Sequence, residues 1–191
     1  MATRKKGKPE WIKTTLDLKD DHRWQAKSGY KVFVAARGAV RFDVPQDWVF
    51  EPDVKSFKFL DRKPPHDDCR LEMSFNLLPE GDWGLFPLKA TLKKIMTDDE
   101  RNAIAVSDVF TIKRQTARIV WAEIKFIDPD EQREAFSRIC ISLGSNVQCL
   151  LTFDYWADQA DRLTPIWDEV LDSLTLGLSI RDPLTGSAFP D

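Results

Sequence analysis

Apolar and polar residues alternate over much of the chain, and this period of two predicts β-strands with one buried face. The segment CRLEMSFNL is the clearest case, because every second residue from Cys69 to Leu77 is apolar. A second case is YKVFVAARGAVRFDVP, where two apolar runs flank the turn-compatible pair Arg37-Gly38. A two-residue loop at this pair aligns apolar residues with each other, so it predicts a hairpin that begins at Tyr30.

Four further strands are predicted within residues 106–155, arranged as a meander. Pro129 in the sequence DPDE indicates a turn between the second and third of these strands. Residues 144–146 are expected to form a three-residue loop between the third and the fourth. This loop would pair Leu143 with Val147, and it would place the apolar residues of both strands on the same face of the sheet.

Two segments have the period of an α-helix. The first is short and follows Pro87, and its apolar face comprises Leu88, Leu92, Ile95 and Met96. The second is longer and runs through ADQADRLTPIWDEVLDSL near the end of the chain. Its apolar stripe keeps its phase across Pro165, so we predict one helix that is kinked at the proline.

These elements predict an α+β fold in a single domain. Apolar residues occur on both faces of the sheet and require a covering layer on each side. We therefore expect an α/β/α sandwich around a mainly antiparallel sheet of about seven strands, closed by a long C-terminal helix. Residues 1–29 are polar and are expected to form an extended arm, either free or docked on the body. Residues 30–177 would form the sandwich domain and residues 178–191 a tail.

Charge and composition argue against several classes of protein. Hydrophobic residues make up 42% of the 191 residues, which is enough for a sizeable core. The chain has 28 basic and 31 acidic side chains, so its net charge of -3 creates no field that would attract nucleic acid or an anionic membrane. It lacks an apolar run of the ~20 residues that span a bilayer, and its start lacks the apolar core of a signal peptide. We expect a cytoplasmic protein with no nucleic-acid or membrane partner, and leave homo-oligomerisation open.

Two stretches resemble segments of a known superfamily. GAVRFDVPQDW at residues 38–48 combines a strand, Val-Pro, a polar pair and Trp, and LTFDYWADQADRLTPIWDEVLDSL at residues 151–174 joins the last strand to a closing helix. The superfamily that these stretches resemble is the PsbP-like one. The order of the elements between them is also similar. The resemblance covers about residues 30–177 and implies an α/β/α sandwich. Characterised relatives, such as the photosystem II subunit PsbP and a Ran-binding nuclear import factor, mostly act by binding proteins, which implies an interaction role.

The two histidines are the candidates for a metal site. His22 follows two aspartates, and His66 precedes Asp67 and Asp68 in RKPPHDDCRLE. If the two segments met, their imidazoles and carboxylates could hold a transition metal, so a metal-binding protein or a small metal-dependent hydrolase is one alternative. The other interpretation is a solvated turn, in which Asp67 or Asp68 bonds local amides. Adjacent residues rarely chelate one ion, so we expect no metal and no cofactor.

The three cysteines are expected to be free thiols. Cys69 is in phase with the apolar face of its strand and is expected to be buried and inert. Cys140 shares a face with Arg138 and Ser142, which makes it the better candidate for an accessible thiol. The expected three-residue loop would place Cys140 and Cys149 on opposite faces of the sheet, where they cannot form a disulfide.

No catalytic residue is indicated, because GxSxG, Walker A, GxGxxG and HExxH motifs and any CxxC pair are absent from the sequence. Trp83 and Phe86 lie in the loop sequence GDWGLFP, where they either contact a partner or cap the core. The leading hypothesis is a non-enzymatic protein-interaction or accessory module. A third hypothesis is a small-ligand binder, with an apolar pocket enclosed between sheet and helices.

Overall fold

The structure is a computed structural model that describes residues 22–188. Its helices are α1 (Leu88–Thr97) and α2 (Ala160–Ser173). Its strands are β1 (Tyr30–Ala35), β2 (Val40–Pro45), β3 (Val49–Pro52), β4 (Phe57–Leu60), β5 (Cys69–Leu77), β6 (Ala105–Val106), β7 (Phe110–Lys113), β8 (Arg118–Ile127), β9 (Glu134–Gly144), β10 (Val147–Trp156), β11 (Thr175–Leu176), β12 (Ile180–Asp182) and β13 (Ser187–Ala188). Short 3₁₀ turns occupy Ala36–Gly38 and Ala157–Gln159.

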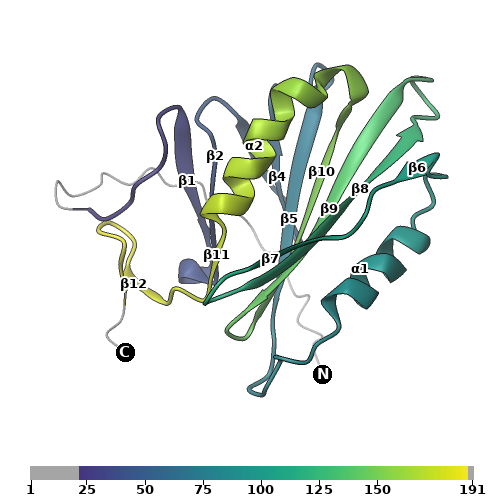
Figure 1. The fold of residues 1–191 in the computed structure, drawn as a ribbon. Coiled ribbons are helices and arrows are strands. Elements are labelled where there is room, and N and C mark those ends of the chain that lie inside the picture. Colours follow the sequence, from purple (N-terminus) through teal and green to yellow (C-terminus); the bar gives the residue numbers. More distant parts are fainter. Residues whose placement is uncertain (1–21, 189–191) are drawn as a thin grey trace, which may run out of the picture.

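The largest sheet has the strand order β3-β4-β5-β10-β9-β8-β6, and β7 also pairs with β8. A smaller sheet has the order β1-β2-β11, and β12 and β13 form a separate hairpin. Every pairing is antiparallel. Helix α2 crosses between the two sheets and packs on β2 and β10, whereas α1 packs on β8 and β9 (Figure 1). The expected α+β sandwich around an antiparallel sheet, with a closing C-terminal helix, is confirmed.

Two hydrophobic cores lie between these layers. The first lies under α2 and between the two sheets, and its largest fully buried members are Phe42, Phe59, Leu71, Phe153 and Trp167. The second lies under α1 and includes Leu88, Leu92, Ile124, Ile139 and Ile141. Strand β8 serves both cores, because Ile119 faces the first and Val120 the second. No helix among residues 22–188 is long and apolar enough to cross a membrane.

The first predicted hairpin has the expected register. Phe33 pairs with Phe42, and Ala35 pairs with Val40. The ring centroid of Phe33 lies 5.2 Å from that of Phe42 and 4.9 Å from that of Phe59 on β4. The small sheet is therefore joined to the large one through aromatic contacts. Such pairs stabilise beyond the area they bury.

The predicted register of β9 and β10 is wrong by one residue. Val147 pairs with Gly144 rather than Leu143, so the turn contains two residues, Ser145 and Asn146. Ser145 has a φ of 50°, which suits the tight turns whose twist matches that of the flanking strands. A shift of one residue moves every side chain of a strand to the other face. The apolar residues of β10 consequently face α2 and the first core, not the second.

Helix α2 runs without interruption through Pro165, as the phase of its apolar stripe predicted. The buried residues on this stripe are Leu163, Trp167, Val170 and Leu171. The short strands β3, β6 and β11 were not predicted. Elements of two to four residues carry too few positions to establish a period.

Arg23 and Trp24, in the described part of the expected N-terminal arm (residues 22–29), contact the loop between β12 and β13. The backbone N–H of Arg23 donates to the carbonyl of Thr185 (2.7 Å), and the indole N–H of Trp24 donates to the carbonyl of Pro183 (2.8 Å). A Cβ at Gly186 would come within 2.8 Å of the Trp24 ring, so glycine is needed for this contact. The segment expected to be a C-terminal tail thus contains a hairpin that holds Trp24. The rest of both segments lies outside the described residues.

Candidate protein-interaction site

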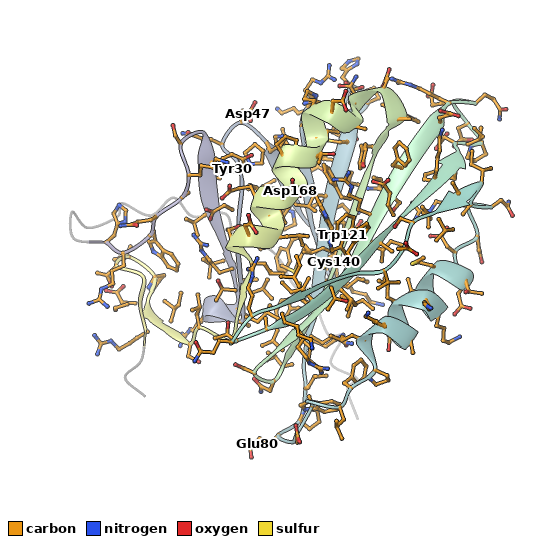
Figure 2. The ribbon with its side chains drawn as sticks, viewed as in Figure 1. Tyr30, Asp47, Glu80, Trp121, Cys140 and Asp168 are labelled. Carbon is orange, nitrogen blue, oxygen red and sulfur yellow. The ribbon has the colours of Figure 1, made fainter. Side chains whose placement is uncertain are left out.

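The loop between β5 and α1, residues 78–87, presents an exposed apolar side chain. Leu85 is 92% exposed, and Leu77 at the end of β5 is 62% exposed. Trp83 and Phe86, the two aromatic candidates, are half-buried and pack against the core under α1. Glu80 lies at the tip of this loop, which projects away from the sheets (Figure 2). We call the surface formed by Leu77, Glu80 and Leu85 the loop surface.

The backbone of this loop is fixed by polar contacts. Arg118 on β8 donates one hydrogen bond to the carbonyl of Trp83 (2.6 Å) and another to that of Phe86 (3.3 Å). The Trp83 indole N–H donates to the carbonyl of Pro79 (3.0 Å), and its ring lies edge-to-face against Phe86 at 6.1 Å. These contacts hold Trp83 and Phe86 inward on either side of Leu85, so the Leu85 side chain points to solvent from a fixed backbone.

The predicted aromatic candidates support the loop from within, and a role for them in contacting a partner stays a prediction. Sequence reasoning missed Leu85, although it stands between Gly84 and Phe86 in the same motif. The weak signal was an apolar residue between two aromatic ones in a segment without helical or strand period. Arg118, which fixes the loop, lies more than thirty residues away, and no local sequence pattern indicates that it contacts this loop.

The candidate metal ligands lie in different places. His66 is exposed on the loop before β5, whereas His22 lines a groove beside β1. Asp67 and Asp68 line a separate cleft of about 220 Å³. Among residues 22–188, no group of three or more His, Cys, Asp or Glu side chains is placed to hold a metal ion.

The turn around His66 is organised by a residue that the sequence did not indicate. The carboxylate of Asp61 accepts hydrogen bonds from the backbone N–H groups of Asp68 (2.9 Å) and Cys69 (3.4 Å). Arg162 on α2 donates to the same carboxylate (3.1 Å), and Asp68 itself forms an ion pair with Arg62. Local amides are therefore bonded, as the solvated-turn interpretation requires, but by Asp61 rather than by Asp67 or Asp68.

The cleft next to Asp67 and Asp68 is lined by four aspartates and two arginines, several of which form ion pairs. Arg101 bonds Asp99 (2.6 Å) and Asp154 (3.0 Å), and the Arg101 guanidinium lowers the pKa of the Asp99 carboxyl. Ser137 donates a hydrogen bond to Asp154 (2.5 Å). Because Arg101 also bonds Ser137 on β9 and Asp154 on β10, this cluster ties the segment after α1 to the sheet.

The family follows from comparison with known proteins. The family model named Alr1449 matches residues 31–180, which is most of the chain. The chain belongs to the Alr1449 family. A relative of this chain, "Uncharacterized protein alr1449" from Nostoc sp. strain PCC 7120, is 68% identical to it over 192 residues, and the match covers the full length of both chains.

The Alr1449 fold is shared with PsbP-like structures, as the sequence resemblance implied. The cyanobacterial PsbP (CyanoP) of Synechocystis sp. PCC 6803 has a TM-score of 0.57 at 10% identity, covering 80% of this chain and 95% of CyanoP. The Ran-binding protein Mog1p of Saccharomyces cerevisiae has a TM-score of 0.52 at 10% identity, covering 77% of this chain and 95% of Mog1p. At this identity the likeness concerns the fold alone.

The prediction that Cys140 is accessible is wrong. Cys140 is fully buried, because the face it shares with Arg138 and Ser142 lies under Trp121 and helix α2 (Figure 2). The corrected register pairs Cys140 with Leu151, so Cys140 and Cys149 lie on the same face of the sheet and in the same core. Cys69 is buried, as its phase predicted.

We expect the native protein at pH 8 to react with Ellman's reagent only as fast as it unfolds. Burial raises the pKa of the Cys69 and Cys149 thiols to about 12 and raises that of Cys140 well above its ordinary value. At pH 8, a thiol with a pKa of about 12 is ionised in about one molecule in ten thousand, and the thiolate is the reactive form. In unfolded, unreduced protein, three thiols per chain should react with the reagent. A smaller number would contradict the prediction that all three cysteines are free.

Proposed function

We propose that this protein is a non-enzymatic accessory module that binds a protein partner, with Leu85 as the anchor of the interface. The observation that carries the proposal is the 92% exposure of Leu85 on a loop whose backbone Arg118 holds in place. An apolar side chain on a fixed loop loses little conformational freedom when it enters a pocket, which favours affinity. Side chains that fill such pockets contribute most of the binding energy at interfaces.

The charge and polarity of the loop surface indicate what kind of surface the partner should offer. Glu80 and Asp82 are exposed on either side of the turn that leads to Leu85. The partner should therefore offer an apolar pocket with a basic rim, because complementary rim charges speed association and orient the complex. Mog1p is named as a Ran-binding protein. The fold that it shares with this chain supports an interaction role here but does not identify the partner. We place the protein in the cytoplasm, and a second copy of the chain is a partner that the same experiment tests.

Substituting Leu85 with aspartate is expected to reduce partner recovery about tenfold or more while leaving stability within about 0.5 kcal/mol of wild type. A carboxylate cannot enter an apolar pocket without losing its hydration. The measurement is quantitative affinity capture from a lysate of the source organism, with the tagged full-length chain and a thermal unfolding curve for each variant.

Val54→Asp is the matched control, since Val54 is also an exposed apolar residue (56%) and lies in a different loop, between β3 and β4. Proteins captured through the loop surface should be retained by Val54→Asp and lost by Leu85→Asp. Equal recovery of every captured protein by both variants would refute the proposal. If the protein lost on Leu85→Asp is the chain itself, the interface is homo-oligomeric.

A further inference from the structure

A groove of about 660 Å³ lies between β1 and the β12–β13 hairpin. None of the residues that form the loop surface lines it. Its apolar lining comprises Trp24, Tyr30, Val32, Val34, Ile180 and Pro183. The three β1 residues alternate in sequence, so they lie on one face of the strand (Tyr30 is labelled in Figure 2). Both the volume and the apolar lining are typical of sites for small molecules.

The charged residues that line this groove are all basic. They are Lys31, Arg37 and Arg181, and His22 adds an imidazole, whereas no Asp or Glu side chain lines it. This bias contrasts with the net charge of -3 of the whole chain. Lys31 donates to the carbonyls of Gln46 and Trp48. Among residues 22–188, the guanidinium groups of Arg37 and Arg181 have neither a hydrogen-bond nor an ion-pair partner.

The turn that carries Arg37 contacts strand β12, which carries Arg181, so the two arginines belong to adjacent segments of the groove wall. Gly38 follows Arg37 and lies so close to Ile180 that a Cβ there would come within 2.8 Å of the Ile180 side chain. Arg181 is the next residue after Ile180. Arg37 has a φ of 53° and Ala36 has a φ of 45°, values that are unfavourable for residues other than glycine. Strained backbone of this kind concentrates at binding sites.

We propose that this groove binds an amphiphile with one apolar chain and one anionic head group. The chain lies along Val32 and Val34 between β1 and the hairpin, and the head group lies between Arg37 and Arg181. Guanidinium groups pair well with carboxylate and phosphate oxygens, so either head group satisfies the site. The apolar chain distinguishes this ligand from a free anion, and the basic end distinguishes it from a neutral lipid.

The test is isothermal titration of the full-length chain with dodecanoate, with dodecyl phosphate and with dodecyltrimethylammonium, each below its micelle-forming concentration. We expect saturable binding of the two anionic amphiphiles, and the tighter of them identifies the head group. The double variant Arg37→Ala/Arg181→Ala should weaken binding about three- to tenfold. Val32→Asp places a carboxylate beside the apolar chain of the ligand and should abolish binding of both anionic amphiphiles.

Lys63→Ala/Lys89→Ala is the control for net charge, because it also removes two exposed cations but leaves the groove unchanged. It should bind dodecanoate as the wild type does. Leu85→Asp should also keep full affinity, which separates this proposal from the function of the loop surface. The proposal is overturned if neither anionic amphiphile binds, if the cationic amphiphile binds as tightly, or if both double variants bind alike. Binding only to vesicles of anionic phospholipid would likewise overturn it in favour of a membrane surface.

Discussion

Replacing Glu123 with alanine is expected to lower the free energy of unfolding by about 3 kcal/mol. Glu123 on β8 accepts hydrogen bonds from Nε of Arg138 (2.7 Å) and from the hydroxyl of Tyr155 (2.7 Å). Arg138 is only 8% exposed, lies over the rings of Trp121 and Tyr155, and donates to Thr164 on α2 (2.9 Å). Without Glu123, a buried guanidinium loses its counter-charge and a buried hydroxyl loses its acceptor.

Urea unfolding followed by far-ultraviolet circular dichroism measures this loss. Glu123→Gln keeps an acceptor oxygen but not the charge, so it should cost less than the alanine variant. The double variant Glu123→Leu/Arg138→Met removes both charges and should recover most of the stability, since apolar residues of similar volume often replace a buried ion pair without loss. If the double variant is as unstable as Glu123→Ala, the stranded charge is not the cause.

The elements with a strict period could be predicted from the sequence. In β5 and in β2, one face is apolar and the other polar, so only one register buries the apolar set. The stripe of α2 spans enough turns to keep its phase across Pro165. The fold class follows from these elements, because a two-sided apolar sheet with two helices has few stable arrangements.

Strand β9 shows why the register of its neighbour could not be predicted. Ile139 and Ile141 bury one of its faces, while Cys140 and Ser142 are small and equally buried on the other. Both faces therefore accept an apolar partner strand, and the alternation of β10 fits either one. The turn decides between them, through the positive φ of Ser145, which a sequence of Gly-Ser-Asn does not specify.

The candidate sites were harder to predict because distant segments build them. Arg118 supports the loop of Leu85 from another strand, and the groove brings Arg37 to the region of Arg181 across most of the chain. Local motifs direct attention instead to adjacent polar residues such as those around His66. In the fold, that stretch forms a turn whose amides are bonded by Asp61. The polar residues around His66 are adjacent in the sequence and therefore suggested a metal site, but the described residues do not form a group of ligands there.

The second large effect is expected at Trp167, whose replacement by alanine should lower the free energy of unfolding by about 3–5 kcal/mol. Trp167 is fully buried on α2. Its ring stacks on Phe153 of β10 (6.0 Å between centroids) and lies edge-to-face with Trp121 of β8 (5.7 Å). Alanine would leave a cavity between helix and sheet that the rigid strands cannot close. Chemical unfolding of the pure variant gives the magnitude.

Trp167→Phe separates packing from hydrogen bonding at the same position. The indole N–H of Trp167 is buried and has no hydrogen-bond partner among the described residues, a situation that costs about 1–3 kcal/mol. Phenylalanine removes this donor and keeps a ring against Phe153, so the released penalty offsets part of the lost contact area. We therefore expect Trp167→Phe to cost less than about 1.5 kcal/mol. A loss as large as that of the alanine variant would mean that the full indole ring, and not an aromatic ring as such, holds α2 on the sheet.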